Sequence, residues 1–244
     1  LNMSETWLPW CVRDDGPPEK RGYTFTGSRS LAVIEGEVKH SAEGGFAALI
    51  GELFKLDRRA SWHFSVAQNG ACHQHYPLES VCWHAGVAGD RFIDTSLVGN
   101  ATLIGIEHEG GGPNAPGEPL TEPQYETSLR LSRDIRARCP HVAASPPILR
   151  RNLWEHNWLS QTSCPSGRIP WGRLIADLQQ EEDDMALSLE DKTAIRQLCL
   201  EAIDLADLEK LGPQIASLEA KLDTLIVGGG LTLEQIKALR FKAE

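Results

Sequence analysis

Short β-rich apolar runs alternate with amphipathic helical segments along the first 178 residues, and this alternation constrains the fold more than any other feature. The β-rich runs cover residues 31–39, 61–68, 71–76 and 103–107. Asn69-Gly70, a strong hairpin-turn signal, separates the second run from the third. Apolar residues at helical spacing mark residues 45–56, 121–138 and 170–180. Strands interleaved with helices predict an α/β domain that ends near residue 178.

The charge distribution divides the chain at the acidic run 181–184. The chain carries 34 Asp and Glu against 24 Lys and Arg, a net charge of −10. Residues 179–244 hold 14 of the acidic and seven of the basic side chains, so the tail alone carries −7. This balance argues against a nucleic-acid partner, which requires a basic face. We expect the chain to divide into an irregular N-terminal arm, a folded domain, an acidic linker and a helical C-terminal segment, at residues 1–30, 31–178, 179–188 and 189–244.

The hydrophobic content, the apolar runs and the cysteine spacing also indicate in which cellular compartment the protein folds. Hydrophobic residues make up 41% of the chain, which is enough for a core and excludes a mainly disordered protein. No apolar run approaches about 18 residues, so we expect no membrane insertion. Residues 1–17 show no basic region followed by an apolar one, so we expect no Sec-type signal peptide. The six cysteines are widely scattered, which favours free thiols of a reducing cytosol over a disulfide framework.

Candidate metal ligands occur at three places along the domain. His40 ends a predicted buried strand and is followed by small residues, and His156 and Cys164 lie eight residues apart around a turn-rich segment. Catalytic zinc sites use three protein ligands and leave one position for water. Each residue alone is weak evidence, because a lone histidine is more often structural than a ligand. A competing pair, His73 and His75, lies on one face of a predicted strand. No third ligand accompanies it in a recognisable pattern, so we expect two exposed polar positions on a hairpin.

The combination of motifs is more specific than any single one. In chain order the motifs are His40-Ser-Ala, Ser61-Trp62-His63-Phe64, Trp83-His84-Ala85-Gly86, Gly105-Ile106-Glu107 and His156-x7-Cys164-Pro165. Over about residues 30–178 this order resembles the zinc N-acetylmuramoyl-L-alanine amidases of the type 2 family, which includes the peptidoglycan recognition proteins. The His-Ser-Ala-Glu-Gly form around His40 is most similar to actinobacteriophage endolysins.

The resemblance implies a fold and a set of metal and catalytic residues. The implied fold is a mixed central β-sheet flanked by helices, with one Zn2+ ion at the bottom of a groove. His40, His156 and Cys164 match the zinc ligands of the family. Glu107 matches a catalytic glutamate of the bacterial branch, although a buried acid paired with a base is the alternative. Thr162 matches a position that is Lys or Thr in catalytic relatives.

The resemblance also implies substrate-binding residues, with one departure from the family pattern. Trp62 stands where several relatives have a catalytic Tyr, and an indole has no acid–base capacity near neutral pH. We therefore assign acid–base chemistry to Glu107 and expect Trp62 to line the groove. Trp83 and His84 match a segment that lines the groove in relatives. His63 either binds substrate as well or orients a metal ligand.

The implied reaction is hydrolysis of the amide between N-acetylmuramic acid and L-alanine in peptidoglycan. We expect a phage or prophage endolysin that is made in the host cytoplasm and acts on the cell wall after release. A cytosolic amidase that recycles muropeptides and a non-catalytic peptidoglycan-binding protein are the alternatives. In the tail, the spacing of Ile215, Leu218, Leu222 and Leu225 favours self-association into a homo-oligomer, and wall targeting is the alternative.

Overall fold

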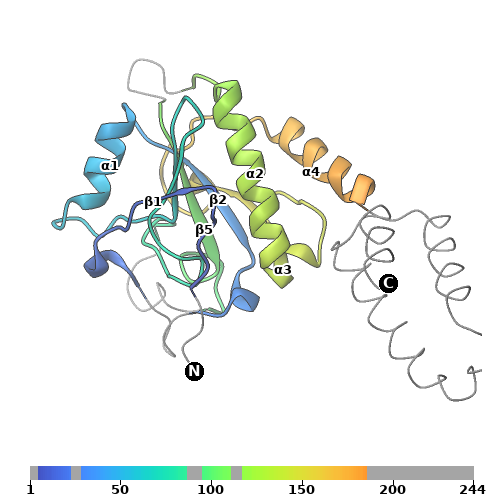
Figure 1. Cartoon of the computed structure of the whole chain (residues 1–244), viewed down its shortest axis with the longest axis horizontal. Helices are drawn as coiled ribbons and strands as arrows, with labels where there is room; N and C mark the ends of the chain where they lie inside the picture. The colour runs from blue at the N-terminus through green and yellow to red at the C-terminus, as the bar shows by residue number, and fades with distance from the viewer. Residues whose placement is uncertain (1–4, 23–28, 87–94, 111–116, 186–244) are drawn as a thin grey trace, which may run out of the picture. The chain divides into compact units, whose positions relative to one another are not determined.

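The computed structural model describes residues 5–22, 29–86, 95–110 and 117–185. The chain divides into two units, residues 1–178 and 179–244. The first unit contains a six-stranded mixed β-sheet flanked by helices, which confirms the predicted fold class (Figure 1). Within the described residues, no helix is long and apolar enough to cross a membrane.

The sheet has the strand order β1-β4-β3-β5-β2-β6. Its strands are β1 (Val12–Arg13), β2 (Gly36–Ser41), β3 (Phe64–Val66), β4 (Cys72–Gln74), β5 (Leu103–His108) and β6 (Leu153–Glu155). Only the β3–β4 pair is antiparallel, and it forms the hairpin that Asn69-Gly70 predicts. The other four pairs are parallel. Parallel strands require crossover connections, because the chain must return to the same end of the sheet.

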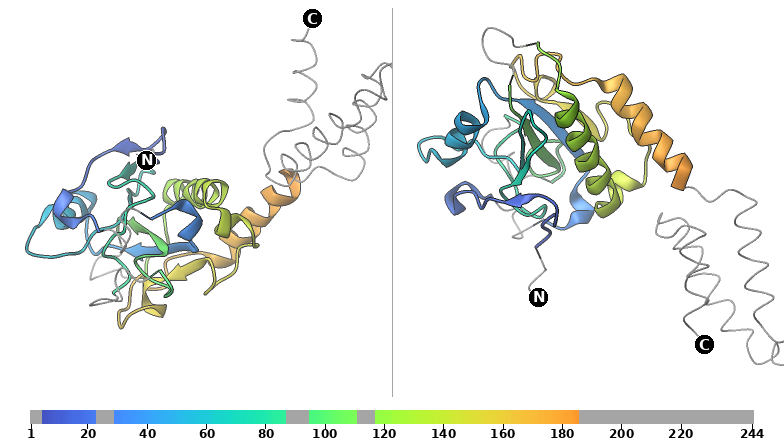
Figure 2. Two further views of the ribbon diagram at one scale, coloured as in Figure 1. Left: turned by 90° about the horizontal axis from the view of Figure 1, so that it is seen from below. Right: turned by 45° about the horizontal axis from the view of Figure 1, so that its top comes forward.

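Among the residues that the structure describes, four helices and three 3-10 turns accompany the sheet. They are α1 (Phe46–Phe54), α2 (Glu122–Arg138), α3 (Pro140–Ala143) and α4 (Trp171–Met185), with η1 (Pro18–Lys20), η2 (Leu31–Val33) and η4 (His156–Trp158). Helix α2 begins with a capping box, in which Thr121 and Gln124 each bond the other's backbone. Figure 1 and Figure 2 show α2 running along one face of the sheet. The main core lies between them and includes Phe64, Ile104, Ile106, Leu131 and Ile135.

The two faces of the sheet carry different chemistry because side chains alternate along each strand. On the α2 face, buried Lys39 Nζ bonds Ser128 Oγ and Ser132 Oγ, each at 2.9 Å, and lies 3.0 Å from a carboxylate oxygen of Glu37. The next residue, His40, therefore lies on the opposite face. The alternation along β2 keeps the helix-packed core apart from the face that carries His40.

Two predicted segments differ from the structure. The strand expected at residues 31–39 begins at Gly36, because Leu31–Val33 forms a 3-10 turn whose start is capped by the Ser30 hydroxyl. The segment 1–30, expected as an irregular arm, contributes edge strand β1 and places Leu8 in the core with 2% of its surface exposed. Backbone pairing with β4 orders this segment. Its pattern of polar and Pro residues does not reveal that pairing.

The predicted acidic linker is helical where the structure describes it. Helix α4 continues through the acidic run to Met185. The rest of the linker and the predicted helical segment 189–244 lie outside the described residues.

Candidate metal centre

The three predicted metal ligands come together on the face of the sheet opposite α2. A ligand atom from each of His40, His156 and Cys164 lies within 4.8 Å of the other two. The rings of the two histidines have centroids 4.6 Å apart, and Cys164 Sγ lies 3.9 Å from His40 Nδ1. Within the described residues this is the one group of three or more such side chains with that spacing.

Neighbouring elements explain why these residues meet. Lys39 on β2 pairs with Glu155 on β6, so the residues that follow them, His40 and His156, lie side by side. The loop that carries Cys164 is held by two backbone amides. Ser41 N donates to Cys164 Sγ at 3.2 Å, and Asn157 N donates to the Cys164 carbonyl at 2.9 Å.

The protonation states of the two histidines suit metal binding. Burial lowers the pKa of His40 well below its ordinary value and also lowers the pKa of His156. Both rings are therefore neutral near pH 7, as a ligand must be. The buried His156 Nε2 has no hydrogen-bond partner in the protein, which leaves its lone pair available.

The donor set also fits zinc. Burial raises the pKa of the Cys164 thiol, and a metal ion is the opposing influence that converts a thiol to a thiolate. Two imidazole nitrogens and one thiolate are a combination that zinc accepts, with one position left open for a reacting ligand. The three residues therefore fit a catalytic type of zinc site.

His84 lies behind His40 and fixes its orientation. His84 Nε2 lies 3.4 Å from the Leu103 carbonyl, which can only accept, so His84 carries its proton there. Its Nδ1 then accepts from His40 Nε2 at 3.2 Å, which leaves the His40 Nδ1 lone pair facing Cys164. Gly105 makes room for this arrangement, since a Cβ there would lie 2.6 Å from the His84 ring.

Glu107 stands next to the ligands. It pairs in register with His40 across β2 and β5, and its Oε1 lies 3.8 Å from His40 Nδ1. Its buried Oε2 has no hydrogen-bond partner in the protein. Burial raises the pKa of the Glu107 carboxyl to about 8. An acid with this environment can exchange a proton near neutral pH.

Thr162 lies on the exposed loop two residues before Cys164. Its Oγ1 accepts a hydrogen bond from Cys164 N at 3.2 Å. The hydroxyl hydrogen of Thr162 remains for another acceptor. The hydrogen bond from Cys164 N therefore ties the Thr162 side chain to the loop that carries the ligand, and its catalytic role stays a prediction.

Three residues predicted to line the substrate groove are buried in the protein. Trp62 is 4% exposed and packs in a cluster with α1 residues such as Leu53, while its Nε1 donates to Ser65 Oγ at 2.8 Å. His63 is fully buried, and its Nδ1 accepts from Gly105 N at 3.1 Å. His84, the third, is 5% exposed.

Trp62, His63 and His84 therefore lie in the protein interior. Their contact with substrate stays a prediction, as does the alternative for His63 that it orients a metal ligand. Segments distant in the sequence cover these side chains: Arg29 Nη2 lies 3.0 Å from His63 Nε2, and the Asn100 side chain accepts from His84 N. Trp83 is only half-buried, and the Arg59 guanidinium lies over its ring at 5.2 Å from the centroid. The predicted contact of Trp83 with substrate stays a prediction.

The competing histidine pair is engaged in hydrogen bonds. His75 Nδ1 lies 2.8 Å from the Asp14 carbonyl, and His75 Nε2 lies 2.8 Å from Ser65 Oγ. His73 Nδ1 lies 3.2 Å from Asp14 Oδ2. Both ring nitrogens of His75 thus have protein partners. The expectation of two exposed positions is wrong for His75, which is 1% exposed because the backbone of Asp14 covers it.

Arg168 is a residue near the site that the sequence analysis missed. Its buried guanidinium bonds Ser41 Oγ at 2.8 Å and the Glu109 carbonyl at 3.1 Å, so it ties the ends of β2 and β5 to the loop after Cys164. An arginine in a segment rich in Ser, Gly and Pro reads as a surface residue, so no sequence signal marks it.

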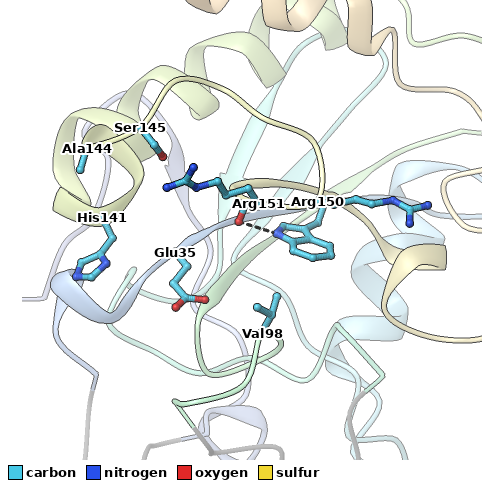
Figure 3. Close-up of a pocket in the computed structure, with 8 residues that line it drawn as sticks. Glu35, Val98, His141, Ala144, Ser145, Arg150 and Arg151 are labelled. Carbon is cyan, nitrogen blue, oxygen red and sulfur yellow. Dashed lines mark hydrogen bonds between the residues drawn. The ribbon is translucent and has the colours of Figure 1, made fainter.

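A pocket lies at the other end of β2 from His40 (Figure 3). It has a volume of about 450 Å³ and is lined by Glu35, Val98, His141, Ala144, Ser145, Arg150, Arg151 and Trp154. Among these lining residues, Trp154 Nε1 donates to the Arg151 carbonyl at 3.0 Å. None of the predicted site residues lines this pocket.

The fold resembles known structures. The selenomethionine derivative of AmpD is 21% identical with a TM-score of 0.52, over 72% of this chain and 98% of that chain. PlyL is 16% identical with a TM-score of 0.50, over 69% of this chain and 96% of that chain. No curated protein matches the chain.

Residues 26–167 match the family described as Amidase_2, N-acetylmuramoyl-L-alanine amidase. The match covers more than half of the chain and includes β2, β5, β6 and the three converging ligands. The chain therefore belongs to the type 2 N-acetylmuramoyl-L-alanine amidase family.

Proposed function

We propose that this amidase is zinc-dependent and serves a phage or prophage as an endolysin. The observation that carries the proposal is the convergence of His40, His156 and Cys164 within 4.8 Å, next to Glu107. One Zn2+ ion per catalytic domain would be held by these three residues. The bond cut is the amide between the lactyl group of N-acetylmuramic acid and L-alanine in bacterial peptidoglycan.

The site has to activate two poor reactants. An amide is a weak electrophile, and its amine is a weak leaving group. When bound, zinc supplies Lewis acidity, which lowers the pKa of water and polarises a carbonyl. Glu107 takes the proton of the attacking water, since its Oε2 is buried without a protein partner beside the ligands. The same carboxyl then passes this proton to the leaving nitrogen.

Two further residues act on the substrate or the ligands. The Thr162 hydroxyl donates to the oxygen that gains negative charge when the carbonyl is attacked. Its own oxygen is oriented for this by the hydrogen bond from Cys164 N. His84 positions His40 through the 3.2 Å contact between the two rings. Trp83 lines the substrate groove, as the resemblance of its motif to the family implies.

The endolysin role is favoured by the residues around His40. The His-Ser-Ala-Glu-Gly sequence there resembles the corresponding segment of actinobacteriophage endolysins. A muropeptide-recycling amidase has the same chemistry but acts on soluble fragments, so substrate size separates the two. A non-catalytic peptidoglycan-binding protein is expected to lack a zinc ligand, and all three positions are filled here.

Digestion of two substrates tests the proposal. Intact cell walls and soluble muropeptides are incubated with the zinc-loaded protein, with the Glu107→Gln variant as the control. Mass spectrometry should find free lactyl groups and free L-alanine amino termini from both substrates with the wild-type protein. Cleavage of soluble muropeptides alone would support the recycling role. Binding to walls without either product would support the binding-protein role.

A further inference from the structure

Cys11 and Cys72 form a pair of thiols outside the metal centre. Cys11 directly precedes β1, and Cys72 begins β4. The two strands are parallel, and Val12 pairs with His73, so Cys11 and Cys72 are the preceding pair in the same register. Their sulfur atoms lie 2.8 Å apart.

The surroundings hold the two thiols against each other. Leu8 N donates to Gln74 Oε1 at 2.7 Å, Asp14 N donates to the Gln74 carbonyl at 3.0 Å, and Cys11 N donates to the Leu8 carbonyl at 3.1 Å. These bonds anchor the chain on both sides of Cys11. The strand itself is weakly held, since β1 pairs only two residues with β4 and both are exposed.

We propose that Cys11 and Cys72 close to a disulfide when the protein meets a small-molecule disulfide, and that this bond fastens the edge strand β1 to the sheet. The inference rests on the register of the two strands and the contact of the two sulfur atoms. It does not depend on the amidase activity.

The exchange proceeds in two balanced steps. The Cys11 thiolate attacks one sulfur of the small disulfide, forms a mixed disulfide and expels one small thiolate. The Cys72 sulfur then attacks Cys11 Sγ, forms the protein disulfide and expels the second small thiolate. The two protein thiol protons end on the two small thiols, and two electrons pass to the oxidant.

Exposure sets the order of these steps. Cys11 is half-exposed, so the oxidant can reach it, whereas Cys72 is 5% exposed. Burial raises the pKa of the Cys72 thiol, which makes it a poor first nucleophile. Cys72 therefore reacts second, within the protein, where it already touches Cys11.

The bond would close a large loop. The ring from Cys11 to Cys72 encloses β2, α1 and β3, and so includes the ligand residue His40. A cross-link that closes a longer loop restricts the unfolded chain more strongly. Oxidation should therefore raise the Tm by about 5 °C or more.

Peptide mapping tests the assignment. The zinc-loaded 244-residue chain is incubated with oxidised glutathione, alkylated and digested with trypsin without reduction. Cleavage after Arg13, Arg59 and Arg91 gives peptides 1–13 and 60–91, which should appear joined, with two hydrogens fewer than the sum of their masses. Cys72→Ala should abolish the joined species. Cys82→Ala, which removes the other cysteine of peptide 60–91, should retain it.

Thermal unfolding supplies the second measurement. Oxidised wild-type protein should melt at a higher temperature than reduced protein, and the Tm of Cys11→Ala should not respond to the oxidant. Glutathione attached to Cys11 without a joined peptide would overturn the proposal. So would a joined peptide in Cys72→Ala, or a wild-type Tm that oxidation leaves unchanged.

Discussion

His40 and Glu107 occupy paired positions on the neighbouring strands β2 and β5, and His40 Nδ1 lies 3.8 Å from Glu107 Oε1. The register of two parallel strands thus sets a predicted metal ligand and a predicted proton carrier side by side. Because side chains at paired positions leave the same face of a sheet, this proximity follows from backbone hydrogen bonding alone. A one-residue slip of either strand would move one of the two to the α2 face.

Replacement of the thiolate ligand should weaken zinc binding. We expect the wild-type protein to hold about one zinc, and Cys164→Ser to lose zinc and activity because a neutral hydroxyl is a poor substitute for a thiolate. Metal analysis after dialysis against a weak chelator measures this. Cys11→Ser, which changes another half-exposed cysteine, should keep its zinc. Zinc loss in a His73→Ala variant, in which His40 is unchanged, would contradict this prediction. It would show that the metal binds at His73 and His75.

Removal of the proton carrier should cut turnover without unfolding the protein. Glu107→Gln should retain zinc and lower kcat by about 10²-fold or more, the scale of a lost general base. Glu109→Gln is the matched control. Its carboxylate accepts from Phe46 N at 2.7 Å and Gln68 N at 2.8 Å, so this variant should lower stability and keep the turnover of the folded protein. Equal kcat in Glu107→Gln and wild type would remove Glu107 from the mechanism.

Removal of the His84 side chain should weaken zinc binding. His84→Ala should bind zinc about 10–100-fold more weakly, because the ring that orients His40 is gone. Its KM at saturating zinc should stay close to that of the wild type. His141→Ala, at an exposed position, should change neither quantity. A raised KM with unchanged zinc affinity would instead make His84 a substrate-binding residue.

Stability should fall as the pH drops below about 6.5. Burial lowers the pKa of His75 to about 4 and that of His63 well below its ordinary value. The unfolded chain has histidine pKa values of about 6.5, so between pH 6.5 and pH 4 it binds protons that the folded state does not. Each such histidine then removes up to about 1.4 kcal/mol of unfolding free energy per pH unit.

Urea unfolding at several pH values measures this loss. His75→Gln, which cannot titrate, should lose less stability than the wild type between pH 6.5 and pH 5. The comparison isolates His75, since every other titrating group is common to both proteins. Parallel pH profiles for the two proteins would show that His75 is protonated equally in the folded and unfolded states.

The tail should cause self-association. Short helices are marginal alone in water, so the apolar residues between 189 and 226 need a partner, and a second copy of the same helices is the commonest solution. Light scattering should find a homo-oligomer for the 244-residue chain and a monomer for a chain that ends at Gln180. The shorter protein should keep zinc and amidase activity. If it cuts soluble muropeptides but no longer intact walls, the tail targets the wall instead.

Several features of the fold could be predicted from local patterns. The alternation of β-rich apolar runs with segments of helical spacing predicts the α/β class, and Asn69-Gly70 predicts the β3–β4 hairpin. Both predictions are possible because each pattern involves residues that are close together in the sequence. Edge strand β1 could not be predicted. It exists because its backbone pairs with β4, which lies about 60 residues further along the chain.

The sequence by itself determined which residues are candidates: the motif order brings His40, Glu107, His156 and Cys164 forward through their resemblance to a family. Only the tertiary structure decided which of the other candidate side chains are buried in the protein and which are partly exposed. Burial depends on what packs over a side chain, and distant segments cover His63 and His84. Trp62 likewise packs against α1 in the core, while Trp83, in the next motif, is only half-buried. Motif spacing carries no information about these contacts, because they join residues that are far apart in the chain.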